Sequence, residues 1–359
     1  MPRQIYHAIN FCSNTAGCFV ADSDGFYKRS IIEAASTNKP ILINGKQIQF
    51  SIMRQGNIDK SYIIGIDPAA DQDNAAIIVI ELNGDHRRIV QCWTTNKKKY
   101  NSLKKKMLER NIEINDDYYA YIARKIRQLM GLFSVEKIVM DKHGGGTAVA
   151  EALSSKRNTP EGEFPIYEEI DYDNPKPSDS EEGLHILRLI VPSSELNSDA
   201  NHGMLKDIQE KILLFPLFDT IELARSATMD DINSVDVDTY EDLVYEIEEL
   251  KNEMTTIIVA QSNTGKETFD TPSIKSEGMR KGHLRKDRFS ALLYANYYAR
   301  NKDKNTDIVV KYTPVGGSRD TVRSSRNKSN ALYCGPGIAQ FKDQSWLNGN
   351  NVRFRKGKL

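Results

Sequence analysis

The 359-residue sequence has no long apolar run and only four cysteines. No stretch reaches the roughly 18 apolar residues of a membrane-spanning helix, and the first residues, MPRQIYHAINFC, lack the basic and apolar regions of a secretory signal. The cysteines form no CxxC pair and no Cys/His cluster with zinc spacing. These absences argue against a membrane protein, a disulfide-rich secreted protein and a zinc-binding module, and they predict a cytosolic protein with reduced thiols.

The sequence also lacks a P-loop for nucleotide phosphates. The pattern G-x-x-x-x-G-K-[ST] needs a glycine loop followed by Lys and a hydroxyl. The segment AQSNTGKET has Ala260 in place of the first glycine and Glu267 in place of the hydroxyl residue, and INGKQIQ fails in the same way. We therefore expect no ATPase motif in this chain.

The net charge is zero, but the charges are unevenly distributed. From Pro160 to Glu253 carboxylates outnumber Lys and Arg by about four to one, whereas NKKKYNSLKKK (96–106) and the residues after Asn301 are basic. A basic patch is typical of proteins that bind a polyanion such as nucleic acid. Solvated surfaces that keep the protein soluble explain the same pattern, so both interpretations stay open.

The apolar pattern predicts an α/β protein. Residues 1–58 look short and irregular, with a helix near 30–35 and a hairpin at PILINGKQIQF around Asn44 and Gly45. YIIGID, NAAIIVIEL and RRIVQCWTT then predict three antiparallel strands. Strands at VEKIVMD and FPIYEEID, a glycine turn and helix at HGGGTAVAEAL (143–153), and helices near 116–133, 203–214, 240–254 and 286–300 complete a mixed sheet flanked by helices. The Gly-, Ser-, Asn- and Arg-rich segment 301–359 predicts a flexible basic tail.

Three aspartates stand out by their placement. Asp67 and Asp141 each end an apolar strand, and Asp287 opens the last strongly amphipathic helix. Cleavage of a phosphodiester by two divalent cations needs several carboxylates that converge, because Mg²⁺ and Mn²⁺ prefer oxygen ligands. Any one of these residues alone is more typical of a strand-end turn or a helix cap.

The three segments together resemble the nuclease domain of tailed-bacteriophage terminase large subunits, the DNA-packaging motors. IIGIDPA, IVMDKHGGG and GHLRKDRFSALLYANYY occur in the family's order, and the resemblance covers roughly 58–300. It implies a ribonuclease H-like fold with an acidic helical insertion over 59–300, a linker-like segment over 1–58 and a tail over 301–359. It also implies that Asp67, Asp141 and Asp287 bind two Mg²⁺ or Mn²⁺ ions and cleave double-stranded DNA.

Other residues near the three aspartates are weaker candidates. Asp73, in the turn after Asp67, is a possible further metal ligand, whereas Asp71 is more typical of a solvated turn. Cations beside carboxylates help to hold them ionised or contact phosphates. The candidates for DNA contact are Lys142, His143, His283, Arg285, Lys286 and Arg288.

The resemblance also implies partners and a location. Terminase large subunits cut concatemeric viral DNA at the procapsid in the host cytoplasm, together with a small subunit, the capsid portal and an ATPase domain. The missing P-loop predicts that this chain is either a fragment of a longer protein or one product of a split gene. Two alternatives remain: a Holliday-junction resolvase or transposase-like nuclease of the same fold, and a non-catalytic packaging assembly module.

Overall fold

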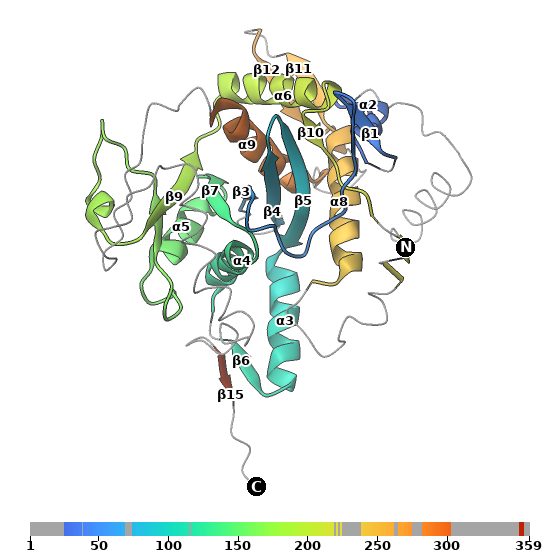
Figure 1. Ribbon diagram of the computed structural model, residues 1–359. Coiled ribbons are helices and arrows are strands. Elements are labelled where there is room, and N and C mark those ends of the chain that lie inside the picture. Colours follow the sequence, from blue (N-terminus) through green and yellow to red (C-terminus); the bar gives the residue numbers. More distant parts are fainter. Residues whose placement is uncertain are drawn as a thin grey trace.

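The protein is described here as a computed structural model (Figure 1). The structure describes residues 25–37, 39–68, 74–114, 116–218, 220–221, 223–224, 238–261, 265–274, 282–302 and 352–354. Among these residues, no helix is both long enough and apolar enough to cross a membrane.

A seven-stranded mixed sheet forms the centre of the fold, with strand order β10-β5-β4-β3-β7-β9-β8. β3, β4 and β5 are antiparallel neighbours, and every other neighbouring pair in the sheet is parallel. The bounds are β3 Ser61–Asp67, β4 Ala75–Asn83, β5 His86–Thr95, β7 Val135–Asp141, β8 Ile166–Glu168, β9 Leu184–Ile190 and β10 Leu213–Leu214. The predicted α/β architecture, with three antiparallel strands followed by strand-helix alternation, is confirmed.

The central strands are apolar on both faces because helices cover both faces. In β3, Ile63 lies in the core cluster on one face, while Ile64 and Ile66 lie in the cluster on the other, and all three are fully buried. Such strands read as continuous apolar runs instead of alternating patterns. This explains why YIIGID and NAAIIVIEL were recognisable from the sequence.

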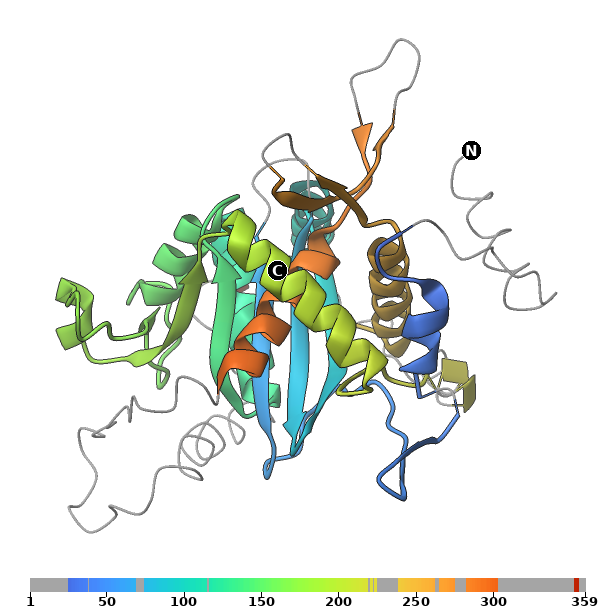
Figure 2. The same ribbon diagram turned by 90° about the horizontal axis from the view of Figure 1, so that it is seen from above.

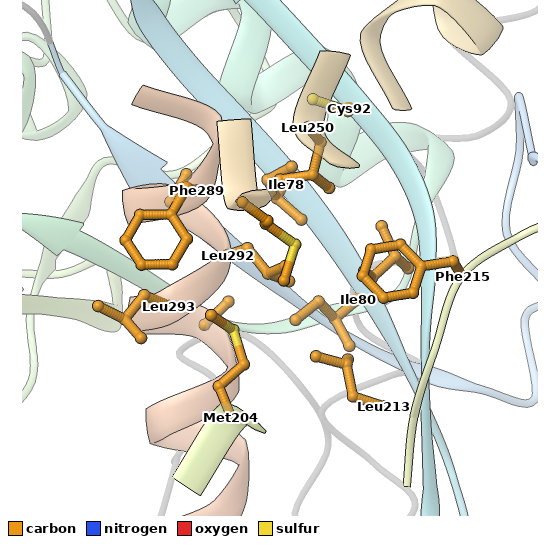
Figure 3. Close-up of a cluster of buried hydrophobic side chains, with 14 of the residues drawn as sticks. Ile78, Ile80, Cys92, Met204, Leu213, Phe215, Leu250, Phe289, Leu292 and Leu293 are labelled. Atoms are coloured by element: carbon orange, nitrogen blue, oxygen red, sulfur yellow. The ribbon is translucent and has the colours of Figure 1, made fainter. Parts of the chain in front are cut away.

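The helices form a layer on each side of the sheet (Figures 1 and 2). One face carries α6 (Ser194–Gln209) and α9 (Asp287–Asn301), with α8 (Tyr240–Thr255) beside β5. Figure 3 shows the apolar side chains of this face, where Phe289, Leu292 and Leu293 of α9 pack with Ile78, Ile80 and Met204. The other face carries α4 (Tyr118–Leu132) and α5 (Gly146–Ser154).

The described part of the N-terminal region packs into the same two cores. It contains α2 (Arg29–Ala34) and the hairpin of β1 (Ile41–Ile43) and β2 (Lys46–Ile48), with Asn44 and Gly45 at positive φ in the turn, as predicted. Tyr27 and Ile32 belong to the core cluster of α9, and Phe50 belongs to the cluster of α4. Residues 25–37 and 39–58 are therefore continuous with the sheet in their packing.

Several elements differ from the sequence prediction. The helix expected near 203–214 is α6, which begins at Ser194 and ends at Gln209, and a short strand follows it. The basic segment after Asn96 forms the helix α3 (Lys97–Glu109), and LHILRLI forms β9; neither element was predicted. The remaining elements are β6 (Ile112–Ile114), paired with β15 (Val352–Phe354), the pair β11 (Ile258–Gln261) and β12 (Glu267–Asp270), the pair β13 (Ser273–Ile274) and β14 (Gly282–His283), and the 3-10 helix Pro177–Ser180. The tail predicted over 301–359 lies outside the described residues, apart from 301–302 and 352–354.

Candidate active site

The three predicted aspartates lie at one end of the central sheet. β3 and β7 are parallel neighbours, and Ile66 pairs with Met140, so Asp67 and Asp141 end adjacent strands at the same edge. Asp287 is the first residue of α9, the helix that packs across β3. Three segments that are far apart in the sequence thus deliver one carboxylate each to the same place.

Gly65 allows α9 to approach β3 closely. A Cβ atom at position 65 would lie 2.1 Å from the carbonyl oxygen of Ala291 and 2.7 Å from the Cβ of Ala295. Any side chain larger than hydrogen would therefore push α9 away from the strand. The glycine two residues before Asp67 sets the distance between that strand end and the first turn of α9.

The three carboxylates interact electrostatically. Burial raises the pKa of Asp67 well above its ordinary value, and the negative charges of Asp287 and Asp141 raise it further. A hydrogen bond from Ser290 and the charge of Lys286 lower that pKa but do not reverse the shift. The site therefore holds more negative charge than the surrounding protein compensates, which favours a bound cation or proton.

Hydrogen bonds fix the orientation of the other two carboxylates. The Tyr294 hydroxyl donates to Oδ2 of Asp141 at 2.9 Å, and the backbone N–H of His143 donates to Oδ1 at 2.8 Å. The backbone N–H of Asn74 donates to Oδ2 of Asp287 at 3.0 Å. A carboxylate has about four lone-pair positions, so both groups keep capacity to accept further ligands.

The glycine turn after Asp141 brings the two strand ends together. Gly144 and Gly145 have φ values of 63° and 119°, in the left-handed region that favours glycine. A Cβ on Gly144 would lie 2.8 Å from the carbonyl oxygen of Pro68, the residue after Asp67. The glycines that follow His143 in the sequence thus allow close contact between two backbone segments of the site.

The residues predicted to contact DNA or metal differ in their exposure and in their ion pairs. Lys142, His143 and Arg285 are exposed, and Nδ1 of His143 lies 3.5 Å from Oδ1 of Asp141. Lys286 forms an ion pair of 3.0 Å with Asp270 while remaining partly exposed. Asp71, Asp73 and the side chain of His283 lie outside the described residues.

Arg288 does not face the exterior, so its predicted contact with DNA disagrees with the structure. The residue is only 5% exposed, and its guanidinium pairs with Glu246 at 2.6 Å and with Glu253 at 2.5 Å. Glu253 also accepts the backbone N–H groups of Arg288 and Phe289, which belong to the first turn of α9. Burial raises the pKa of Glu253 to about 6, although Arg288 lowers it. Arg288 thus anchors α9 to α8, an arrangement hidden from the sequence because its partners lie more than 30 residues upstream.

The chemistry of this site fits a divalent cation, although the side chains do not form a closed ligand cage. Within the described ranges, no group of three or more His, Cys, Asp and Glu side chains is arranged to hold a metal ion. The donors are nevertheless carboxylate oxygens, which hard cations prefer. Lys286 and Arg288 pair with other carboxylates, and the charge of Lys286 does not offset the raised pKa of Asp67, so an added cation would be stabilised at this site.

Sequence reasoning missed the residues that support the three aspartates. Ser290 and Tyr294 follow Asp287 at intervals of three and seven residues, which places all three on one face of α9. This helical spacing is a signal that the sequence contains. Asn74 acts through its backbone N–H, and no side-chain pattern reveals such a role.

The chain is similar in structure to nuclease domains of phage large terminases. The large terminase nuclease from thermophilic phage G20c with bound cobalt is 12% identical, with coverage of 78% of this chain and 98% of that chain and a TM-score of 0.43. The Thermus phage P74-26 large terminase nuclease domain is 11% identical, with coverage of 76% and 94% and a TM-score of 0.40. The HK97 bacteriophage large terminase is also 11% identical, but the match covers 76% of this chain and 43% of that one, with a TM-score of 0.41. No protein-family model and no curated protein matches the sequence. At these identities and TM-scores, function has to be argued from the residues of the site.

Proposed function

We propose that the protein is a divalent-metal-dependent endonuclease that cleaves double-stranded DNA. The observation that carries this proposal is the meeting of Asp67, Asp141 and Asp287 at one end of the sheet, where burial and the charges of the other two raise the pKa of Asp67. Uncompensated carboxylates of this kind suit Mg²⁺ or Mn²⁺, whose function in nucleases is to bind phosphate oxygens and activate water.

Each residue of the site has a distinct part in the proposal. Asp67, Asp141 and Asp287 would hold two ions, which supply Lewis-acid polarisation of the phosphodiester when bound. Ser290 donates a hydrogen bond to Asp67, and Tyr294 and the His143 N–H orient Asp141. This set of donors keeps the carboxylates directed toward the site, so that little reorganisation is needed when the substrate binds.

The proposed biological role is the cutting of concatemeric viral DNA during genome packaging. It follows from the sequence resemblance to terminase large subunits, together with the predicted partners: the small subunit, the portal and an ATPase domain or chain. The predicted place of action is the procapsid in the host cytoplasm. Contacts mainly to phosphates predict little sequence specificity.

Cleavage of supercoiled plasmid tests the proposal. We expect nicking and linearisation with Mg²⁺ or Mn²⁺, none with a chelator, and none with Asp67→Asn or Asp287→Asn. The matched control is Asp85→Asn, because Asp85 is exposed in the turn between β4 and β5, at the opposite end of the sheet. Cleavage by either site variant at the wild-type rate would remove that residue from the mechanism, and cleavage without metal would refute the metal requirement.

Cleavage of other DNA substrates separates the alternative functions. A resolvase would cut a labelled four-way junction in preference to linear duplex of the same sequence. A non-catalytic assembly module would leave every substrate intact with every metal, while still binding DNA.

A further inference from the structure

A basic groove lies beside the candidate active site and has no role in the chemistry described so far. It has a volume of about 530 Å³ and runs between α3 and the segment that leads into α9. The residues that define its chemistry are Asn96, Lys98, Lys99, Ser102, Lys106 and Arg285.

Every ionisable side chain that lines the groove is a cation. Lys98, Lys106 and Arg285 are exposed and form no ion pair within the part of the chain that the structure describes. Lys99 is partly neutralised, because its Nζ lies 3.8 Å from Oε1 of Glu246. Clustered cations without counterions repel one another and raise the local positive potential, which favours a polyanionic ligand.

The groove-facing side of α3 is not needed to hold the helix in place. Tyr100 and Met107 are buried and anchor α3 to the protein, and Asn96 caps its first turn by accepting the backbone N–H of Lys99. Lys98, Ser102 and Lys106 are spaced by four residues and form one row on the helix surface. Because anchoring uses other residues, the charge of this row is available for a ligand.

The groove connects directly to the carboxylate site. The Asn96 side-chain amide donates to Oδ1 of Asn74 at 2.8 Å, and the Asn74 backbone N–H donates to Asp287. Arg285 lies two residues before Asp287. Figure 2 shows α3 and the beginning of α9 at the same end of the central sheet. The groove is therefore connected to the carboxylate site at Asp287.

The dimensions of the row suit a nucleic-acid backbone. Lys98 and Lys106 are eight residues apart, or about 12 Å along the helix axis. One strand of duplex DNA carries a phosphate about every 3.4 Å along its axis, so the row matches roughly three or four phosphates. Ser102, between the two lysines, donates its hydroxyl to the Lys98 carbonyl oxygen at 3.0 Å, so the lysines supply the phosphate donors of the row.

We propose that the groove formed by α3 and Arg285 binds the phosphate backbone of double-stranded DNA and holds the duplex next to the carboxylate site. The inference rests on the proposed nuclease function for its substrate. It adds a binding surface in which Lys98, Lys106 and Arg285 are the principal phosphate contacts.

Salt-dependent DNA binding tests this surface. Binding of a fluorescein-labelled duplex is measured by anisotropy in EDTA, in an Asp67→Asn background that prevents cleavage. The groove variant combines Lys98→Gln, Lys106→Gln and Arg285→Gln. The control variant combines Lys39→Gln, Lys46→Gln and Arg157→Gln, which removes the same number of exposed charges outside the groove. Circular dichroism checks that both variants fold.

The groove variant should bind DNA more weakly than the control variant and with less dependence on salt. Each phosphate contact contributes about 0.9 to the slope of log K against log salt, so three contacts change it by about 2.7. Between about 50 mM and about 200 mM salt, this difference amounts to roughly 40-fold in relative affinity. Equal affinities and slopes for the two triple variants would overturn the proposal.

Failure of the groove and failure of the nuclease function have different signatures. If the groove variant loses binding while no metal supports cleavage by the wild-type protein, the groove stands and the nuclease proposal falls. If the wild-type protein cleaves with metal, the groove variant binds like the control, and the same groove substitutions in the wild-type background leave cleavage unchanged, the nuclease proposal stands and the groove falls.

Discussion

Replacement of Gly65 by alanine tests whether the packing of α9 on β3 sets the geometry of the site. The added methyl would lie 2.1 Å from the Ala291 carbonyl oxygen, whereas an ordinary carbon contact is about 3.5 Å. Relief of this clash requires α9 to move by about 1 Å or more. Overpacking of this kind costs about 1–3 kcal/mol of folding free energy. A shift of about 1 Å in a catalytic group lowers the rate by about 10²-fold.

Gly183→Ala is the matched control for this effect. A Cβ at Gly183 would lie 2.6 Å from the Tyr167 ring and 2.7 Å from the Pro165 carbonyl oxygen, so it clashes to a similar degree near β8 and β9. Urea denaturation should show a loss of stability in both variants. Plasmid cleavage, measured where both are fully folded, should fall about 10²-fold only in Gly65→Ala. A Gly65→Ala protein that is destabilised yet cleaves at the wild-type rate would refute the link between α9 packing and the site.

Three further substitutions test two supporting residues and the raised pKa of Asp67. Tyr294→Phe removes the hydroxyl that donates to Asp141 and should slow cleavage about tenfold, equivalent to ~1.4 kcal/mol, with little effect on the urea midpoint; an unchanged rate at every metal concentration would exclude an orienting role. Arg288→Met leaves two glutamates buried without their cation and should cost about 3–5 kcal/mol in urea denaturation, whereas a stability within experimental error of wild type would show that this pairing adds nothing. Asp67→Asn should stabilise the metal-free protein near neutral pH, because the raised pKa means that folding favours the protonated form. The stability that wild-type protein gains from protonated Asp67 is fully present below the unfolded-state pKa of about 3.9, and it is lost as pH rises through the higher pKa of the folded state. The stability advantage of Asp67→Asn should therefore disappear in acid, and an advantage that grows in acid would contradict the raised pKa.

The sequence predicted the elements whose signals are local. β3 and β7 read as apolar runs that end in aspartate, because both strands lie in the interior of the sheet with helices on both faces. The hairpin at Asn44 and Gly45 was recognisable because its turn needs positive φ at both residues. The placement of Asp67 and Asp141 at one edge followed from these strands and their parallel pairing.

Elements with mixed surfaces were not predictable in the same way. β9 is only partly buried along most of its length. LHILRLI therefore shows neither the alternation of apolar and polar residues seen in a half-buried strand nor the continuous apolar run of a fully buried one. α3 is dominated by lysines, and its helical form depends on the Asn96 cap and on the burial of Tyr100 and Met107. A run of lysines suggested a charged surface without indicating that the surface is one side of a helix.

Long-range contacts set the rest of the site. The sequence shows a glycine at position 65, but only the structure shows that α9 lies against it. The sequence likewise shows Arg288 beside a candidate catalytic acid, and its position alone suggests phosphate contact. The structure instead places it between Glu246 and Glu253, two members of the acidic stretch.

Part of that acidic stretch therefore serves as an internal counterion for the helix that carries the site. α9 presents Asp287, Ser290 and Tyr294 on one face. Arg288, the residue after Asp287, fixes the first turn of α9 to α8. Glu253 accepts the N–H groups at the start of α9 that no intrahelical carbonyl satisfies. Glu246 also lies within 3.8 Å of Lys99, a residue of the basic groove. The α8 glutamates thus connect the groove, the anchor of α9 and the carboxylate site, so a change in α8 is expected to affect DNA binding and cleavage together.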